Sequence, residues 1–289
     1  MKTAPKIVLA GVAFLALTQA VACGLVNQAN ASAVVVATVL YTPPTGVPAD
    51  ALAFDAGVPN IDAGISIDAG VTVPSESVVA VFFGNKGANL DVAPTGVAGA
   101  TVTLQEVGGA RFPLIDQGGG NYGLGADAGF TYKPGVTYDV TVEHAGQSYV
   151  GEVANTPQVE RIAQFHPAKG YVEQPANTAF TFTRPEPAGG QELPLGFVTV
   201  VPLTAQGAGS VTYTNVPQTP LQFLKLVVAP SDWKKQTVEV PGTAFPEANA
   251  NYLIILQSAK LGGPKTENLF LGSPILAGTA DVAIVKTNP

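Results

Sequence analysis

The chain has 289 residues, a formal net charge of −7 and a charged fraction of only 12%. So few lysines and arginines exclude the basic surface with which nucleic-acid binding proteins contact phosphates. A hydrophobic content of 46% excludes an intrinsically disordered chain, because such chains lack the apolar residues that form a core.

The first 22 residues have the organisation of a secretory signal peptide. Lys2 and Lys6 give a positive start, and residues 7–17 form an unbroken run of apolar and small residues. That run is shorter than the roughly 20 apolar residues that a transmembrane helix needs. We therefore expect residues 1–22 to be cleaved off as a signal peptide before Cys23, the only cysteine of the chain.

The expected cleavage point resembles the lipobox of bacterial lipoproteins. Val21-Ala22-Cys23 fits that pattern, and Ala20 stands where the family favours leucine. The resemblance implies that Cys23 carries a covalent lipid, the only added group we expect, and that this lipid anchors the protein in a membrane. Gly24, in place of an aspartate, implies the outer membrane, with the protein facing the periplasm or the cell surface.

Two further expectations follow from this N-terminus. Residues 23–32 would form the lipidated N-terminus and a short polar tether. The alternative to lipidation is an ordinary signal peptide that is cut nearby, which would leave Cys23 as a free thiol that has no partner in its own chain.

The rest of the chain has the composition of an all-β protein. The 32 glycines and 24 prolines interrupt it every few residues, as the turns between strands do. Val, Thr, Phe, Tyr and Ile dominate the segments between these turns, and these residues favour strands. No segment combines a helical period with capping residues. We expect two tandem antiparallel β-sandwich domains, which are immunoglobulin-like in class.

The first domain is expected to span residues 33–157. Apolar runs or alternating patterns predict its main strands. The strand before the first proline pair is nearly all apolar, so we expect it to be buried on both faces. The last two strands flank the turn Ala145-Gly146 and therefore predict an antiparallel hairpin. The predicted strands cover residues 33–41, 76–84, 99–107, 136–143 and 147–153.

A biased loop between the first two strands repeats the tripeptide Asp-Ala-Gly. Its copies begin at Asp55, Asp62 and Asp68, and a fourth copy begins at Asp127. Carboxylates at short spacing suggest calcium, which takes six to eight oxygen ligands, but the spacing of an EF-hand is absent. The alternative is a turn-rich loop in which Asp caps and Gly turns the chain.

Residues 94–157 resemble a known type of domain. The runs GATVTL, GGGNYG and KPGVTYDVTVEHAGQSYVGEV are similar to the small prealbumin-like or carboxypeptidase-regulatory-like β-sandwich domains of bacterial surface proteins. The resemblance implies a fold and no activity, because such domains serve mostly as spacers, stabilisers and binding modules.

Residues 158–175 are expected to link the first domain to a second sandwich over residues 176–289. Residues 178–184 alternate, which places Phe180 and Phe182 inward. The remaining predicted strands include residues 221–229, as a buried strand, residues 251–258, as the strongest core strand, and residues 280–286.

No motif for catalysis or metal binding stands out, so we expect neither catalytic nor metal-ligating residues. His144 and His166 have no metal-ligand spacing. The glycines of residues 118–123 match a dinucleotide fingerprint, but no helix is expected after them, so they predict a turn between strands. Asp116 and Asp127 flank this turn and leave open a hydrolase that uses a carboxylate pair.

Trp233 is the aromatic residue that we single out for contact with a partner. It follows Ser231-Asp232 and precedes two lysines, which predicts a half-exposed loop position. The other aromatic residues alternate along strands and are expected in the core.

The sequence favours a non-enzymatic lipoprotein of the outer membrane with a structural, adhesive or partner-binding role. It would contact the membrane through its lipid and a protein or glycan at the cell envelope, and it would not contact nucleic acid. The alternative is a surface module that binds calcium or carbohydrate.

Overall fold

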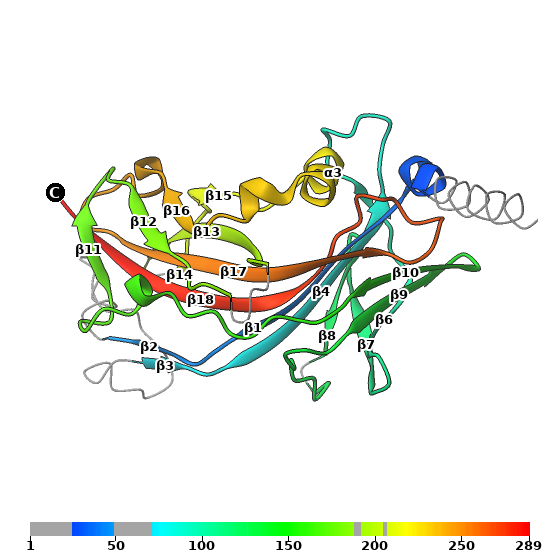
Figure 1. Cartoon of the computed structure of the whole chain (residues 1–289), viewed down its shortest axis with the longest axis horizontal. Coiled ribbons are helices and arrows are strands. Elements are labelled where there is room, and N and C mark those ends of the chain that lie inside the picture. The colour runs from blue at the N-terminus through cyan, green and yellow to red at the C-terminus, as the bar shows by residue number, and fades with distance from the viewer. Residues whose placement is uncertain (1–24, 49–70, 126, 188–191, 205–206) are drawn as a thin grey trace, which may run out of the picture.

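The computed structural model describes residues 25–48, 71–125, 127–187, 192–204 and 207–289 (Figure 1). Strands dominate these ranges, so the all-β class is confirmed. The helices among the described residues are α3 (Pro220–Val228), a helical segment over residues 25–30, and short 3-10 turns. None of the described helices is long and apolar enough to cross a membrane.

The strands in chain order are β1 (Ala33–Thr42), β2 (Thr45–Val47), β3 (Val71–Val73), β4 (Glu76–Asn85), β5 (Thr95–Gly96), β6 (Thr101–Glu106), β7 (Arg111–Gly118), β8 (Asn121–Leu124), β9 (Tyr138–His144), β10 (Gln147–Val153), β11 (Val172–Pro175), β12 (Phe180–Thr183), β13 (Leu195–Thr204), β14 (Gly207–Ala208), β15 (Tyr213–Thr214), β16 (Thr237–Val240), β17 (Asn251–Pro264) and β18 (Ile275–Asn288). The 3-10 turns are η2 (Ala163–Phe165), η4 (Pro230–Trp233) and η5 (Gly242–Ala244). The strands predicted at residues 33–41, 76–84 and 147–153, and the hairpin of β9 and β10, are confirmed.

Nine of the described strands form a ladder that closes on itself. Its order is β18, β1, β4, β8, β7, β6, β9, β10 and β17, and β17 pairs again with β18. β1 runs antiparallel to β4 and parallel to β18. The closed ladder leaves β1 without a free edge, so the first strand of the body is paired on both sides.

The ring closes where β10 meets β17, and glycine permits this close approach. Two pairs join these strands, Gly151 with Pro264 and Glu152 with Gly263. A Cβ atom added to Gly262 would lie 1.8 Å from the Glu152 carbonyl oxygen. A strand position that lies so close to a neighbouring backbone accepts only glycine.

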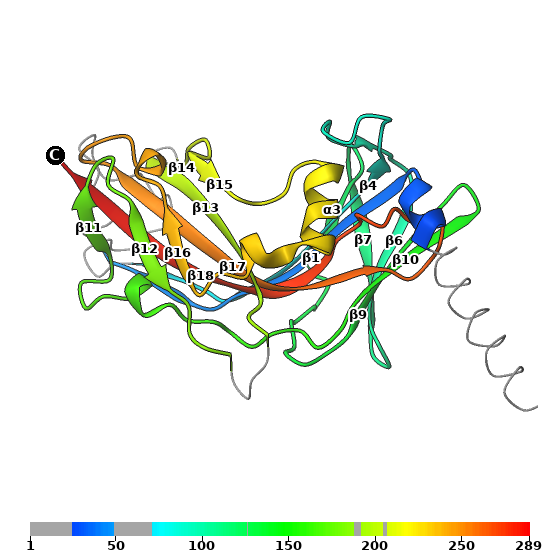
Figure 2. The ribbon, with the colours of Figure 1, turned by 45° about the horizontal axis from the view of Figure 1, so that its top comes forward.

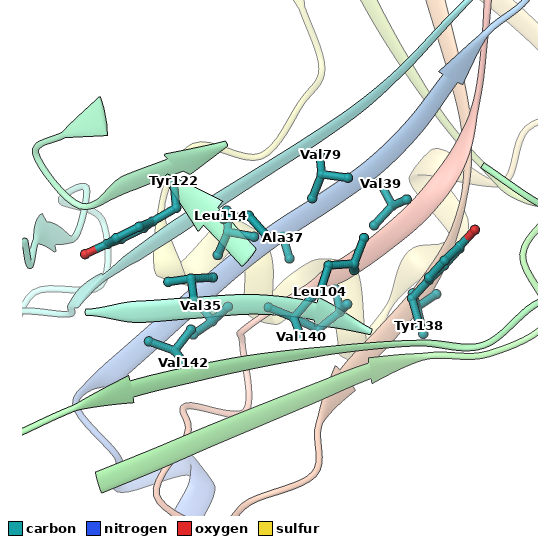
Figure 3. Close-up of a cluster of buried hydrophobic side chains, with 14 of the residues drawn as sticks. Val35, Ala37, Val39, Val79, Leu104, Leu114, Tyr122, Tyr138, Val140 and Val142 are labelled. Carbon is teal, nitrogen blue, oxygen red and sulfur yellow. The ribbon is translucent and has the colours of Figure 1, made fainter. Parts of the chain in front are cut away.

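The ring encloses the first hydrophobic core (Figure 3). Alternate residues of each strand point inward, as Val35, Ala37 and Val39 do on β1. The outward-facing residues of β1 are only partly covered from Val36 onward, so the prediction of burial on both faces is correct only for its first residues. The buried Tyr122 keeps its hydroxyl satisfied, because it donates to the Val97 carbonyl and accepts from the Ala100 amide, both at 3.0 Å.

The second core lies where β17 and β18 continue beyond the ring. There β17 pairs with β13, β18 pairs with β11, and the small sheet of β12 and β16 packs over them (Figures 1 and 2). Phe180 and Phe182 of β12 point inward as predicted. This core contains residues of β12, β13, β16, β17 and β18 and residues in or next to η2 and η5: Ile162, Phe165, Phe180, Phe182, Val198, Val200, Val240, Ala244, Phe245, Tyr252, Ile254, Leu256, Ala283 and Val285.

This arrangement differs from two domains that follow one another along the chain. β1 pairs with β18, and Ile275 and Ala277 of β18 lie in the first core. The expected linker, residues 158–175, packs against the sheet, where Ile162 and Phe165 are buried. The physical reason is strand length: β17 and β18 have 14 residues each, beyond the usual 3–10, so the same two strands contribute to both cores.

The prediction of a buried strand at residues 221–229 is wrong, because this segment forms the helix α3. Thr219 and Gln222 make a reciprocal capping box, which satisfies the free amides of the first turn. Phe223 and Leu226, three residues apart, face inward. Leu226 joins Leu195, Phe197 and Ala259 in a third small cluster on the outer face of the sheet. The Thr219–Gln222 capping box and the spacing of Phe223 and Leu226 are visible in the sequence, so the expectation that no segment combines a helical period with capping residues is also wrong here.

We predict that Gly262→Ala destabilises the protein, because the new methyl group collides with the β10 backbone. Overpacking of this kind costs about 1–3 kcal/mol of unfolding free energy. We expect a loss near the upper end of this range, because the obstacle is backbone, which cannot move aside as a side chain can. The measurement is the free energy of unfolding in denaturant.

The matched control is Gly263→Ala, since a Cβ at Gly263 meets no atom within 4 Å. Surface changes of this kind usually stay within about 0.5 kcal/mol. Equal losses in the two variants would contradict a steric role for Gly262.

Candidate functional site

The structure describes only some of the residues that the sequence singled out. Cys23 and the aspartates Asp55, Asp62 and Asp68 lie outside the described residues. The lipidation and calcium hypotheses therefore stay predictions. Trp233 lies among the described residues, and a cleft opens beside it.

Trp233 ends η4, the 3-10 turn that follows α3. Its side chain is partly exposed and packs against the cluster of Leu226 and Phe197. The indole Nε1 donates a hydrogen bond to the Asn215 carbonyl oxygen at 2.9 Å. The predicted half-exposed position is confirmed, and contact with a partner stays a prediction.

Asn215 fixes the segment that receives this indole. Its side-chain Oδ1 accepts from the Val198 amide at 2.7 Å, and its Nδ2 donates to the Gly196 carbonyl at 3.3 Å. The Asn215 amide also donates to the Val198 carbonyl at 3.2 Å. These bonds extend the ladder on β13, so Trp233 is anchored to a strand of the large sheet.

A cleft of about 180 Å³ opens beside the indole. Trp233 and Tyr213 provide aromatic surface, and Asp232, Lys235 and Glu239 bring charges of both signs. The volume is below the 300 Å³ or more of sites for drug-sized ligands. The cleft therefore suits one side chain of a partner or one ring of a glycan.

The groups around the cleft can form directed hydrogen bonds. Burial raises the pKa of the Tyr213 phenol, so the hydroxyl stays neutral and can donate. An aromatic side chain with a polar tip is the type of residue that dominates protein interfaces.

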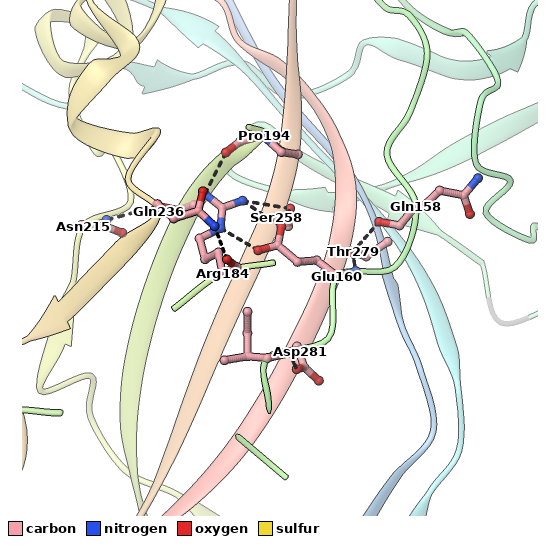
Figure 4. Close-up of polar contacts among 11 residues, drawn as sticks. Gln158, Glu160, Arg184, Pro194, Asn215, Gln236, Ser258, Thr279 and Asp281 are labelled. Atoms are coloured by element: carbon pink, nitrogen blue, oxygen red, sulfur yellow. Dashed lines mark hydrogen bonds and ion pairs between the residues drawn. The ribbon is translucent and has the colours of Figure 1, made fainter. Parts of the chain in front are cut away.

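A buried polar network (Figure 4) lies against Gly196, which lines this cleft. Arg184 is only 1% exposed, and its guanidinium makes a bidentate ion pair with Glu160: Nε to Oε1 is 2.6 Å and Nη2 to Oε2 is 2.8 Å. Its Nη1 donates to the Pro194 carbonyl at 2.8 Å, and Nη2 donates to Ser258 Oγ at 3.2 Å. Ser258 in turn donates to Glu160. Every polar group of this buried pair is thereby satisfied.

The network also fixes the strand that lines the cleft. The Arg184 amide donates to the Gln236 carbonyl at 2.9 Å, and the Gln236 side chain donates to the Arg184 carbonyl. A Cβ at Gly196, which lines the cleft, would lie 2.9 Å from Arg184 Nη1. The cleft is therefore built on a rigid support, and sequence reasoning missed this support because its members lie far apart in the chain.

The two histidines lie in different surroundings. His166 Nε2 lies 2.8 Å from Oδ1 of the buried Asp281, whose Oδ2 accepts from the Ile162 amide at 2.7 Å. These contacts attach the expected linker to β18. His144 lies beside Phe83, with ring centroids 5.6 Å apart. Among the described residues, no group of three or more His, Cys, Asp and Glu side chains could ligate a metal.

Asp116, a candidate for the carboxylate pair, stabilises a turn. Its oxygens accept from the Gly99 amide at 2.9 Å and from the Gly118 amide at 2.7 Å. These backbone hydrogen bonds lower the pKa of the Asp116 carboxyl, and a lowered pKa makes a poor general acid. Gly118, Gly119 and Gly120 have positive φ angles of 87°, 61° and 80°, as the predicted glycine turn requires.

A second hollow, of about 460 Å³, lies at the wall of the ring. β8 pairs with β4 only from Ala80 to Phe82, so β4 is not paired by β8 at Glu76 to Val79. The hollow is lined by this part of β4 and by residues around Phe130. Its size lies in the range of ligand sites, but half of its described lining residues are Gly, Ala or Ser, and they hold no cluster of charged groups.

Comparisons with known proteins assign no family. No family model and no curated protein match the chain. Among solved structures, the FN1-FN3 domains of chicken CNTN1 match 73% of this chain at 9% identity with a TM-score of 0.26. The match covers 63% of that chain, and a TM-score this low carries no weight, so the fold stands on the strand pairing itself.

We predict that Arg184→Ala lowers the free energy of unfolding by about 3–5 kcal/mol, because it leaves the Glu160 carboxylate buried without its partner. Denaturant unfolding followed by circular dichroism measures the loss.

Lys169→Ala is the control, since Lys169 and Glu173 form an exposed ion pair and such pairs contribute little. A loss for Arg184→Ala as small as that of the control would contradict the role assigned to the buried pair.

Proposed function

We propose that the protein is a lipoprotein of the outer membrane that binds a protein or glycan partner at the cell envelope and has a non-enzymatic, structural or adhesive role. Its anchor would be lipid on Cys23, which the Val21-Ala22-Cys23 pattern supports. The single observation that favours binding is the Trp233 cleft, an aromatic pocket with charged groups around it on a rigid sheet.

The cleft supports partner binding for a specific physical reason. Binding energy concentrates in a few well-packed anchors, and tryptophan and tyrosine are the commonest of them together with arginine. Asn215 and the Arg184 network fix the cleft before any partner arrives, so little ordering entropy would be lost on binding.

A carbohydrate module is the second candidate. Trp233 and Tyr213 offer aromatic surface beside Asp232 and Asn215, which can bond hydroxyl groups. Calcium binding by Asp55, Asp62 and Asp68 remains a separate proposal that rests on the sequence alone.

The organisation into two units is proposed at the level of the cores. Apart from β17 and β18, which complete the ring, the first core would correspond to the expected domain of residues 33–157, and the second core to that of residues 176–289. The second core has the two layers of a sandwich, with β12 and β16 over β13, β17 and β18.

The anchor is tested by Cys23→Ala with metabolic fatty-acid labelling. We expect the wild type to be labelled and the variant to be unlabelled and either released or retained as precursor. Cys23 is the only cysteine, so labelling of the variant through any other thiol is impossible. Continued labelling would contradict lipidation at this residue.

The cleft is tested by photo-crosslinking in intact cells from a reactive residue placed at Glu239. We expect a defined adduct that Trp233→Ala loses and Trp233→Phe partly keeps, because phenylalanine retains aromatic surface. Val107→Ala, a change at an exposed residue of another loop, is the control. An adduct of equal yield in all variants would contradict the role of the cleft. In vitro, Trp233 is the only tryptophan, so its fluorescence reports directly on glycan binding.

A further inference from the structure

The N-terminal helical segment is attached to the body of the protein. Asn27 Nδ2 donates to Glu267 Oε2 at 3.1 Å, and Gln28 Nε2 donates to the Thr266 carbonyl at 3.3 Å. The Leu271 amide donates to the Gln28 carbonyl at 3.0 Å. Residues 25–30, part of the expected tether, therefore pack on the loop of residues 265–271.

The residues that connect this segment to the sheet are held by backbone hydrogen bonds. The Lys86 amide donates to the Ser32 carbonyl at 2.9 Å, and the Phe270 amide donates to the Ala33 carbonyl at 2.8 Å. β1 begins at Ala33 and is paired on both sides. The segment thus continues directly into the sheet.

The same end of the molecule includes the β9–β10 turn. Asn268 Nδ2 donates to the Ser148 carbonyl, and the Val150 amide donates to Thr266 Oγ1, both at 3.2 Å. Figures 1 and 2 show the helical segment and this hairpin together at one end of the long axis. β11, β12 and the C-terminus lie at the other end.

Covalent geometry limits the distance between the acyl chains and this end. Cys23 is two residues before Leu25. A chain spans at most about 3.6 Å per residue, so the two Cα atoms lie within about 7 Å of each other in any conformation. The hydrocarbon core of a bilayer is about 30 Å thick, so the connection of residues 23–25 is short compared with the membrane.

The side chains at this end suit an interfacial contact. Leu25 is 49% exposed and Val26 is 58% exposed. Lys86 lies over the Phe270 ring, with 4.9 Å between Nζ and the ring centroid. Glu267 of the neighbouring loop is acidic. The charged groups at this end are thus of both signs, so contact with lipid would come from the apolar side chains and from the short connection of residues 23–25.

Resting on the proposed lipidation of Cys23, we propose that the end formed by residues 25–30, residues 265–271 and the β9–β10 turn lies directly on the lipid surface. The long axis then leads away from the membrane. β12 lies toward the far end and β16 lies between β12 and the middle of the long axis; because β16 lines the Trp233 cleft, the cleft would lie away from the lipid and be open to partners.

The test uses the full mature lipoprotein in vesicles of phosphatidylethanolamine and phosphatidylglycerol that contain nitroxide-labelled lipid. Acylation occupies Cys23, so a cysteine introduced elsewhere is the only free thiol and takes a fluorophore. The three positions are Val26→Cys, Gln147→Cys on the hairpin, and Thr181→Cys on β12, all at exposed residues.

We expect nitroxide lipids to quench most of the fluorescence at positions 26 and 147 and none at position 181. Equal quenching at all three positions, or none at position 26, would overturn the proposed orientation. Flotation with the vesicles is measured in parallel. A protein that does not float refutes the lipid anchor, whereas one that floats without quenching at position 26 refutes the orientation alone.

A second variant tests whether the short connection of residues 23–25 causes the orientation. Twenty Gly and Ser residues inserted between Gly24 and Leu25 should leave flotation unchanged and remove most of the quenching at position 147. Unchanged quenching at position 147 would show that the short connection of residues 23–25 does not cause the orientation.

Discussion

The pairing of β17 with β18 is the interaction on which the rest of the structure depends. The ladder runs from Asn251 with Lys286 to Gly262 with Ile275. One end of it completes the ring around the first core, and the other supports β13, β11 and the second core. Because both cores are built on the same two strands, we expect them to lose structure together rather than as separate units. Gly262 permits the ring to close on this ladder.

A single face of β18 shows how the two cores join. Ile275 and Ala277 lie in the first core, and Ala283 and Val285 lie in the second, all on one side of the strand. Between them the same side carries Thr279 and Asp281, both buried. These polar groups have partners from residues 158–166, and the Arg184 network continues from Glu160 of that segment. The chain crossing between the two cores is thus fixed by hydrogen bonds, and Glu160 connects this crossing to Arg184, which lies against Gly196 of the cleft beside Trp233.

The proposed function and orientation depend on these constraints together. A rigid cleft limits the entropy lost on binding. A short connection between the lipid on Cys23 and the body would limit the directions in which the cleft can point. An anchored protein whose body lies on the membrane presents its far end at a defined height. Such a geometry suits a protein that contacts a partner across the envelope or at the cell surface.

The sequence by itself determined the β class, the main strands and the turns, because alternation and glycine act locally. It also placed Trp233 in a half-exposed position and identified the lipobox pattern. Only the tertiary structure decided that β1 pairs with β18, that Arg184 meets Glu160 and Ser258, and that residues 25–30 pack on the body. These contacts join residues that are 24 to about 240 positions apart, and no local pattern encodes such distances. The helix α3 was missed for the opposite reason, because a buried apolar run is equally compatible with helix and strand until its cap is weighed.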